Sequence, residues 1–306
     1  MRLLPEKPSL WQVILILGIG VFTVSTSAIF IRLAIASANI RGVGFSLFLA
    51  ASRLTLASLI LLPTWRQLPQ KQVPSRSYYF AVAAGVSLAF HFATWITSLS
   101  FTSIVASTTL VTTNPVWVAL FSWVWFKERL SRLTILGIAI ALIGGIFIAF
   151  GDTSSMNAES NPLLGDILAL IGAVTASLYL LFGREAQKQG LTIGNYVAIA
   201  YTTAAIILLP LPFLFNTSYT GYPTAVYLAI LAMAIFPQLI GHTSFNWAVR
   251  WISPTFITLA ILFEPVFSSL LGFVIFGEVP GLFVLLGAMV LLGGVAIATW
   301  GIRENA

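Results

Sequence analysis

Residues 101–151 of the chain read FTSIVASTTLVTTNPVWVALFSWVWFKERLSRLTILGIAIALIGGIFIAFG. The pattern returns 150 positions later, without a gap, in residues 251–301, WISPTFITLAILFEPVFSSLLGFVIFGEVPGLFVLLGAMVLLGGVAIATWG. The coincidences include a proline inside an apolar run and a lone acidic residue: Pro115 with Pro265, and Glu128 with Glu278. Chance aligns leucines and glycines in apolar sequence, but rarely these two residue types in one register. We therefore interpret the chain as two copies of one unit.

The composition is that of a membrane protein. Hydrophobic residues make up 58% of the 306 residues, and charged residues make up only 8%, against about 25% in a soluble domain. The formal net charge of +6 does not indicate a nucleic-acid partner, because the basic residues lie in short loops between apolar runs. The chain has no cysteine, which excludes disulfides and thiolate metal sites. We expect no cofactor and no bound metal.

Ten apolar runs are long enough to cross a bilayer as helices, which needs about 20 residues each. They lie at roughly 11–36, 43–63, 78–98, 103–125, 133–150, 165–183, 193–215, 223–247, 253–276 and 280–300. The longest connection, 152–164, is polar and rich in serine and asparagine. It divides the chain into a first unit at 1–151 and a second at 165–306, and we expect five helices in each.

The basic residues predict the orientation of the ten helices. With the N-terminus inside, twelve lysines and arginines fall on the inner side and two on the outer side, so both termini are expected in the cytoplasm. Five helices per unit is an odd number, so the two units must point in opposite directions. The loop at 127–132, KERLSR, is basic, whereas its counterpart at 277–282, GEVPGL, has no basic residue. We therefore predict an all-α integral membrane protein built as two inverted five-helix repeats, with any shared site near the middle of the membrane.

The motifs TNPVWVALFSWVWFKERLS and EPVFSSLLGFVIFGE, each followed by a glycine-rich segment ending in LIGG or LLGG, resemble the EamA family of the drug/metabolite transporter (DMT) superfamily. The resemblance covers essentially the whole chain. It implies a ten-span transporter, not an enzyme, that works as an exporter or facilitator in the bacterial cell inner membrane. The family's substrates include amino acids, other metabolites and xenobiotics, so the resemblance does not select among them.

Two charged residues are expected deep in the membrane, where ionisable groups usually face a cavity or a partner. Arg53 lies at the centre of the second run and is a candidate for holding a substrate carboxylate or phosphate. Glu264 lies at the centre of the ninth run and is a candidate for proton coupling or for binding a substrate amine. The alternative for both is structural, including a salt bridge between them. The pair also suits a zwitterion such as an amino acid.

Glu264 precedes Pro265, and its repeat counterpart Asn114 precedes Pro115. Proline removes a backbone donor, so both helices are expected to be open or kinked at these points. Paired broken helices at the midplane are typical of a transporter site. Asn114 is a candidate substrate contact, although asparagine also joins helices to one another.

Aromatic and histidine residues complete the predicted site. His91 and Trp95 are four residues apart in the third run and share a helix face, and Tyr179 lies in the sixth run. A histidine bonded to a neighbouring hydroxyl is the structural alternative for His91. We place His242 at the inner membrane interface. The two histidines form no metal-binding pair.

The fifth and tenth runs carry small residues at packing spacing, which predicts helix seams. The residues are Gly137, Ala141, Gly145, Ala288, Leu292 and Ala296. The chain is expected to act as a monomer or as a homodimer across these seams. Three functions remain open: an alternating-access carrier of a small molecule, with or without proton coupling; a membrane enzyme, for which no catalytic cluster is visible; and a receptor without transport.

Overall fold

The computed structural model describes residues 8–66, 73–126, 131–152, 161–252, 257 and 260–304, and every regular element within them is a helix. The predicted basic segment 127–130 and most of the linker, 153–160, lie outside the described residues. The elements are α1 (Leu10–Ser25), α2 (Ser27–Ala38), α3 (Val43–Ile60), α4 (Leu62–Trp65), α5 (Ser75–Ser98), α6 (Ile104–Val111), α7 (Asn114–Phe126), α8 (Arg132–Asp152), α9 (Pro162–Lys188), α10 (Ile193–Leu208), the 3₁₀ helix η1 (Leu211–Phe215), α11 (Thr224–Met233), the π-helix η2 (Ala234–His242), α12 (Thr243–Ala248), α14 (Glu264–Phe276) and α15 (Leu282–Glu304).

The helices are apolar on several faces, as lipid requires. Within the described residues, seven are long and apolar enough to cross a membrane, and three shorter apolar helices lie at Arg132–Ile148, Glu264–Phe276 and Leu282–Ala298. Large apolar side chains such as Leu142 and Val274 point outward and are exposed. Such an apolar surface is favourable in contact with lipid tails and unfavourable in contact with water.

Polar side chains begin several helices by accepting bonds from free backbone N–H groups. Ser9 and Gln12 form a capping box at the start of α1, and Ser103 accepts from the third residue of α6. The first residue of α6, Ile104, donates its backbone N–H to Glu278 Oε1 at 2.7 Å. Glu278 is the last residue of the second repeat motif, and its bond to Ile104 ties the segment after α14 to the start of α6.

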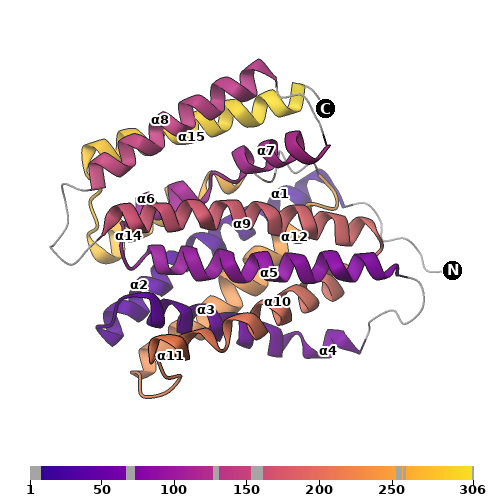
Figure 1. The fold of residues 1–306 in the computed structure, drawn as a ribbon, viewed down its shortest axis with the longest axis vertical. Helices are drawn as coiled ribbons and strands as arrows, with labels where there is room; N and C mark the ends of the chain where they lie inside the picture. Colours follow the sequence, from indigo (N-terminus) through magenta and orange to yellow (C-terminus); the bar gives the residue numbers. More distant parts are fainter. Residues whose placement is uncertain are drawn as a thin grey trace.

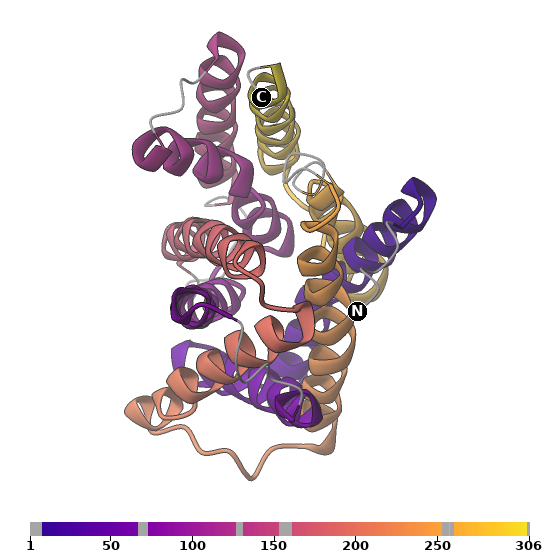
Figure 2. The same cartoon turned by 90° about the vertical axis from the view of Figure 1, so that its right-hand side faces the viewer.

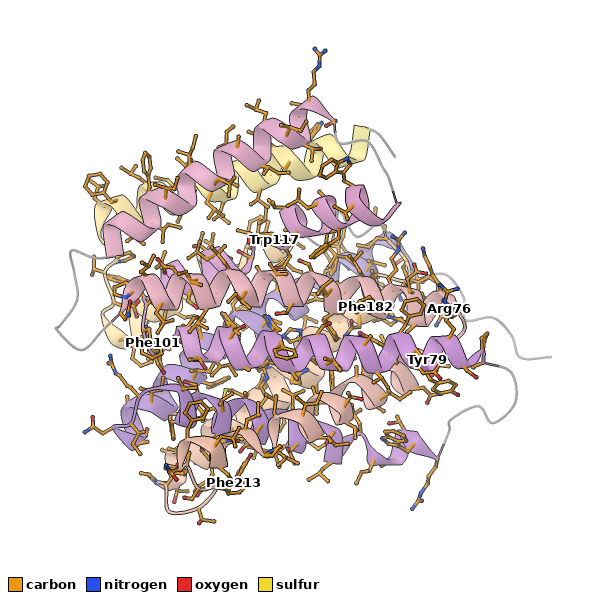
Figure 3. All side chains as sticks on the ribbon, in the orientation of Figure 1. Arg76, Tyr79, Phe101, Trp117, Phe182 and Phe213 are labelled. Carbon is orange, nitrogen blue, oxygen red and sulfur yellow. The ribbon has the colours of Figure 1, made fainter. Side chains whose placement is uncertain are left out.

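The helices pack across the two halves of the sequence. α5 lies along α9 and α8 lies along α15, with α10 against α5, α11 against α2 and α1 against η2 (Figure 1). Figure 2 shows α8 and α15 side by side at one edge of the molecule. Arg76 and Phe101 lie toward opposite ends of α5 in Figure 3, and Trp117 lies between α7 and α9. Each of these helix pairs joins a segment before residue 153 to one after residue 161, so neither half of the chain packs alone.

The α8–α15 pair meets through glycines. A Cβ added at Gly144 would lie 2.3 Å from the backbone nitrogen of Leu291 and 2.7 Å from the carbonyl oxygen of Gly287, and one added at Gly137 would lie 2.6 Å from the carbonyl oxygen of Gly294. As the residue number rises along α8 it falls along α15, so the two helices run antiparallel. Backbones approach this closely only where no side chain intervenes.

The predicted seam exists, and Gly137 and Ala141 of the expected row lie in it, but the contacts differ from the expectation at Gly145 on α8 and along the predicted row on α15. Gly145 does not meet the α15 backbone, because its nearest neighbours are the side chains of Leu110 and Leu291 at 3.8 and 3.9 Å. On α15 the close contacts fall at Gly287 and Gly294, not on the row that starts at Ala288. Glycine allows a closer approach than alanine, so the glycine rows decide the register. These rows already contact each other, so a homodimer would need a different surface.

Candidate functional site

Each of the two X-Pro positions begins a helix. α6 ends at Val111 and α7 begins at Asn114, with a turn between them, and α14 begins at Glu264. Pro115 and Pro265 are each the second residue of the new helix. Proline suits this position, because the first turn of a helix has no partner for its N–H groups. Both polar residues are therefore placed at the start of a helix.

These two helix starts line one partly open cavity of about 40 Å³. Five of the six predicted substrate-binding residues line it. The lining comes from both halves of the chain: Val24, His91, Trp95, Val111, Thr112, Asn114, Ala176, Tyr179, Leu180, His242, Phe245, Ile261 and Glu264. A buried water needs roughly 10–15 Å³ by this measure, so the cavity has room for a few waters. A metabolite requires it to widen.

His91 is held in one orientation. Its Nδ1 lies 2.9 Å from the carbonyl oxygen of Gly172. A carbonyl only accepts, so Nδ1 carries the proton, and in the neutral ring Nε2 is then an acceptor. The ring stacks on Trp95, with centroids 5.8 Å apart and planes 5° from parallel. The Nε1 of Trp95 is buried and has no hydrogen-bond partner among the described residues.

His242 lies at the cavity instead of at the membrane interface where we expected it. Its ring centroid is 5.3 Å from that of Phe92, 6.3 Å from that of His91 and 6.5 Å from that of Tyr179. His242 ends the π-helix η2. A π-helical turn holds one residue more than an α-helical pattern allows, and each extra residue rotates the following side chains by about 100° around the helix axis. Apolar periodicity does not reveal such a rotation. Tyr179 accepts a hydrogen bond from Asn246 Nδ2 at 2.6 Å, which fixes its hydroxyl.

Asn114 and Glu264 are both only 7% exposed. The backbone carbonyl of Asn114 accepts from Ser177 Oγ at 3.2 Å, but its side-chain Oδ1 has no partner in the described part of the chain. Glu264 forms no salt bridge there, since the ion pair found among the described residues joins Lys188 to Glu185. A polar group buried without a partner is costly, and Asn114 Oδ1 is such a group at the cavity wall.

Arg53 does not line the cavity. Its side chain is fully buried and its charge is held by protein groups: Nε donates to Gln238 Oε1 at 2.9 Å, and Nη1 donates to Ser27 Oγ at 2.7 Å. The guanidinium carbon lies 4.1 Å from the centre of the Phe92 ring, which is a cation–π contact. Nη2 has no partner among the described residues. Arg53 thus joins α3 to α2 and to η2.

The described residues contain no group of three histidine, cysteine or acidic side chains close enough to hold a metal ion. The cavity instead combines an aromatic wall with a few polar atoms. This combination is typical of a small-molecule binding site.

Residues 6–150 and 163–300 each match the model of the EamA-like transporter family. The chain belongs to this family. Its members are transporters and not enzymes. The two matches cover most of both sequence units.

Three curated relatives are named as transporters or exporters, and one solved structure has a similar fold. The chain is 28% identical to "Uncharacterized transporter YdfC" of Bacillus subtilis, over 61% of this chain and 59% of that protein. It is 28% identical to "Uncharacterized inner membrane transporter YedA" of Escherichia coli, over 63% and 60%. It is 27% identical to "Probable terminal-alkyne amino-acid exporter" of Streptantibioticus cattleyicolor, over 64% and 65%. These matches span less than two thirds of each of the three relatives. A crystal structure at 18% identity superposes with a TM-score of 0.62 over 97% of this chain and 100% of that one, which shows the fold alone.

The EamA-like chain is therefore a multi-pass protein of the inner membrane. The lipid bilayer is its solvent.

Proposed function

We propose that this chain is a secondary transporter that carries small metabolites such as amino acids across the cytoplasmic membrane by alternating access, as an exporter or a facilitator. The observation that carries the proposal is the cavity, in which polar residues from both halves meet at two helix starts. Asn114 and Glu264 stand at corresponding positions of the two sequence units. The relative named as an amino-acid exporter supports the substrate class.

The proposal includes ten spans in two inverted repeats with both termini in the cytoplasm. The three shorter apolar helices would bring the seven long ones to ten. The glycine contacts support the inversion: Gly137 meets Gly294 and Gly144 meets Gly287, and in each case the partner is the repeat counterpart of the other glycine. Such a reciprocal, antiparallel contact is the arrangement that a two-fold axis lying in the membrane plane produces.

The widening of the cavity is the step that links this structure to transport. At about 40 Å³ the cavity is too small for a metabolite, so the proposed cycle requires a state in which it is wider. α6 and α14 are short helices beside the two breaks, so small rotations about residues 112–113 and 262–263 would enlarge it. Glu264 at this point would provide the group for proton coupling.

Counterflow in proteoliposomes tests the proposal. Vesicles loaded with an unlabelled solute should take up the labelled form of that solute from the medium. The solutes are a panel of amino acids, organic acids and cationic drugs, and each is tested with and without a pH gradient. Saturable counterflow of one class is expected, weakened by Glu264→Gln. Glu185→Gln is the matched control, because Glu185 forms only a half-exposed pair with Lys188.

If folded protein moves no member of the panel, the carrier proposal fails and a receptor role is favoured. If only the drugs move, the chain is a drug exporter and the metabolite part fails. A response to the pH gradient would show proton coupling.

A further inference from the structure

The cavity lining contains hydrogen-bond acceptors that a ligand can use. Asn114 Oδ1 is a buried acceptor without a partner, and the carboxyl of Glu264 has no ion-pair partner among the described residues. His91 donates from Nδ1 to Gly172, which leaves Nε2 as a third acceptor. The lining also contains donors, and among them Trp95 Nε1 is buried without a partner in the described part of the chain. Three acceptors around one small space match the three N–H groups of a primary ammonium ion.

We infer that the cavity binds the ammonium group of a primary amine, with Glu264 as its counter-ion and Asn114 and His91 as further acceptors. This inference rests on the proposed function and names the chemical feature of the substrate that the site recognises. The ammonium group supplies the donor that Asn114 Oδ1 lacks and a close counter-charge for Glu264, which forms no salt bridge among the described residues. A carboxylate in the same place would face acceptors and repel Glu264.

Arg53 does not provide an alternative anion site at the cavity wall. Its Nε and Nη1 are used by Gln238 and Ser27, and the ring of Phe92 covers its face at 4.1 Å. The guanidinium also lies outside the set of lining residues. Arg53 acts as a positioning residue, because it holds the π-helix that carries His242.

The rest of the lining fits an apolar or aromatic body attached to the amine. Trp95, Tyr179 and Phe245 form aromatic walls, and the remaining contacts come largely from aliphatic side chains. Aromatic faces attract cations and pack against rings. The small present volume favours a compact –NH₃⁺ head over a quaternary ammonium, which has no N–H to donate.

The test compares two probes that share a phenyl ring and differ in the charged group: 2-phenylethylamine and 3-phenylpropionate. Binding to the purified full-length chain is followed by tryptophan fluorescence and calorimetry. We expect saturable binding of the amine, weakened about tenfold to a hundredfold by Glu264→Gln, the usual effect of losing a charge-assisted bond. Glu185→Gln should bind as the natural sequence does. Thermal melting is used to check that Glu264→Gln is folded, and Asn114→Asp provides a second variant that should strengthen amine binding.

Preferential binding of the propionate overturns the inference, as does binding of neither probe, or amine binding that both variants leave unchanged. The outcome is separable from that of the transport proposal. Counterflow of organic acids without amine binding leaves the carrier intact and removes the ammonium site. Amine binding without any counterflow supports the site and removes the carrier.

Discussion

Replacing Gly144 with alanine should force α8 and α15 apart. The new Cβ would lie 2.3 Å from Leu291 N and 2.7 Å from Gly287 O, and both are backbone atoms that cannot rotate away. Ordinary contact begins near 3.4 Å, so the helices must separate by roughly 1 Å. Overpacking of this kind costs about 1–3 kcal/mol, while alanine recovers about 1 kcal/mol of helix propensity.

The adjacent Gly145 provides the matched control. A Cβ there would meet only side-chain atoms, at 3.8 and 3.9 Å, which is normal packing. Gly145→Ala gains the same propensity without the clash, so the difference between the two variants isolates the clash at about 1–3 kcal/mol. At roughly 2–4 °C per kcal/mol, Gly144→Ala should melt about 2–12 °C below Gly145→Ala. The assay is thermal unfolding of the purified chain in one detergent. Equal melting temperatures, or a higher one for Gly144→Ala, would refute the close backbone contact.

Two further substitutions test buried polar contacts. Gln238→Ala removes the acceptor of Arg53 Nε and should destabilise the fold by about 1–3 kcal/mol. The control is Gln187→Ala, which removes a buried amide with no partner among the described residues and should cost less in the same melting assay. A larger loss of stability for Gln187→Ala would contradict the role given to Gln238. Glu278→Ala removes the acceptor for Ile104 N and should cost about 1 kcal/mol, while Glu278→Gln keeps an acceptor and should melt close to the natural chain. If the glutamine variant loses as much stability as the alanine variant, the contribution comes from the negative charge and not from the hydrogen bond.

The sequence predicted the class of fold because its signals are local. Apolar runs mark the helices, and the Asn-Pro and Glu-Pro pairs mark the points where α7 and α14 begin. The same local signals identified His91, Trp95 and Tyr179, which the structure places at one cavity with Asn114 and Glu264. Polar groups in membrane helices usually face a cavity or a partner, which explains why these side chains meet at one cavity.

Contacts between distant segments were not accessible in the same way. Arg53 meets Gln238, 185 residues away, and nothing in either local sequence indicates the pairing. His242 was assigned to the interface because a regular helix was assumed, whereas η2 is a π-helix. Pro237 within η2 is the signal that was available, because proline breaks the ordinary hydrogen-bond ladder of a helix and causes irregular turns.

The π-helix also has an energetic consequence for the proposed transport cycle. α5 has 24 residues, whereas its counterpart, Thr224–Ala248, has 25, and a π turn is how a helix accommodates one additional residue. Two identical inverted halves would give inward-facing and outward-facing forms of equal free energy. One added residue, together with glutamate in place of asparagine at the second helix start, removes that degeneracy. In such a transporter the resting population is biased toward one side of the membrane before any substrate or gradient acts.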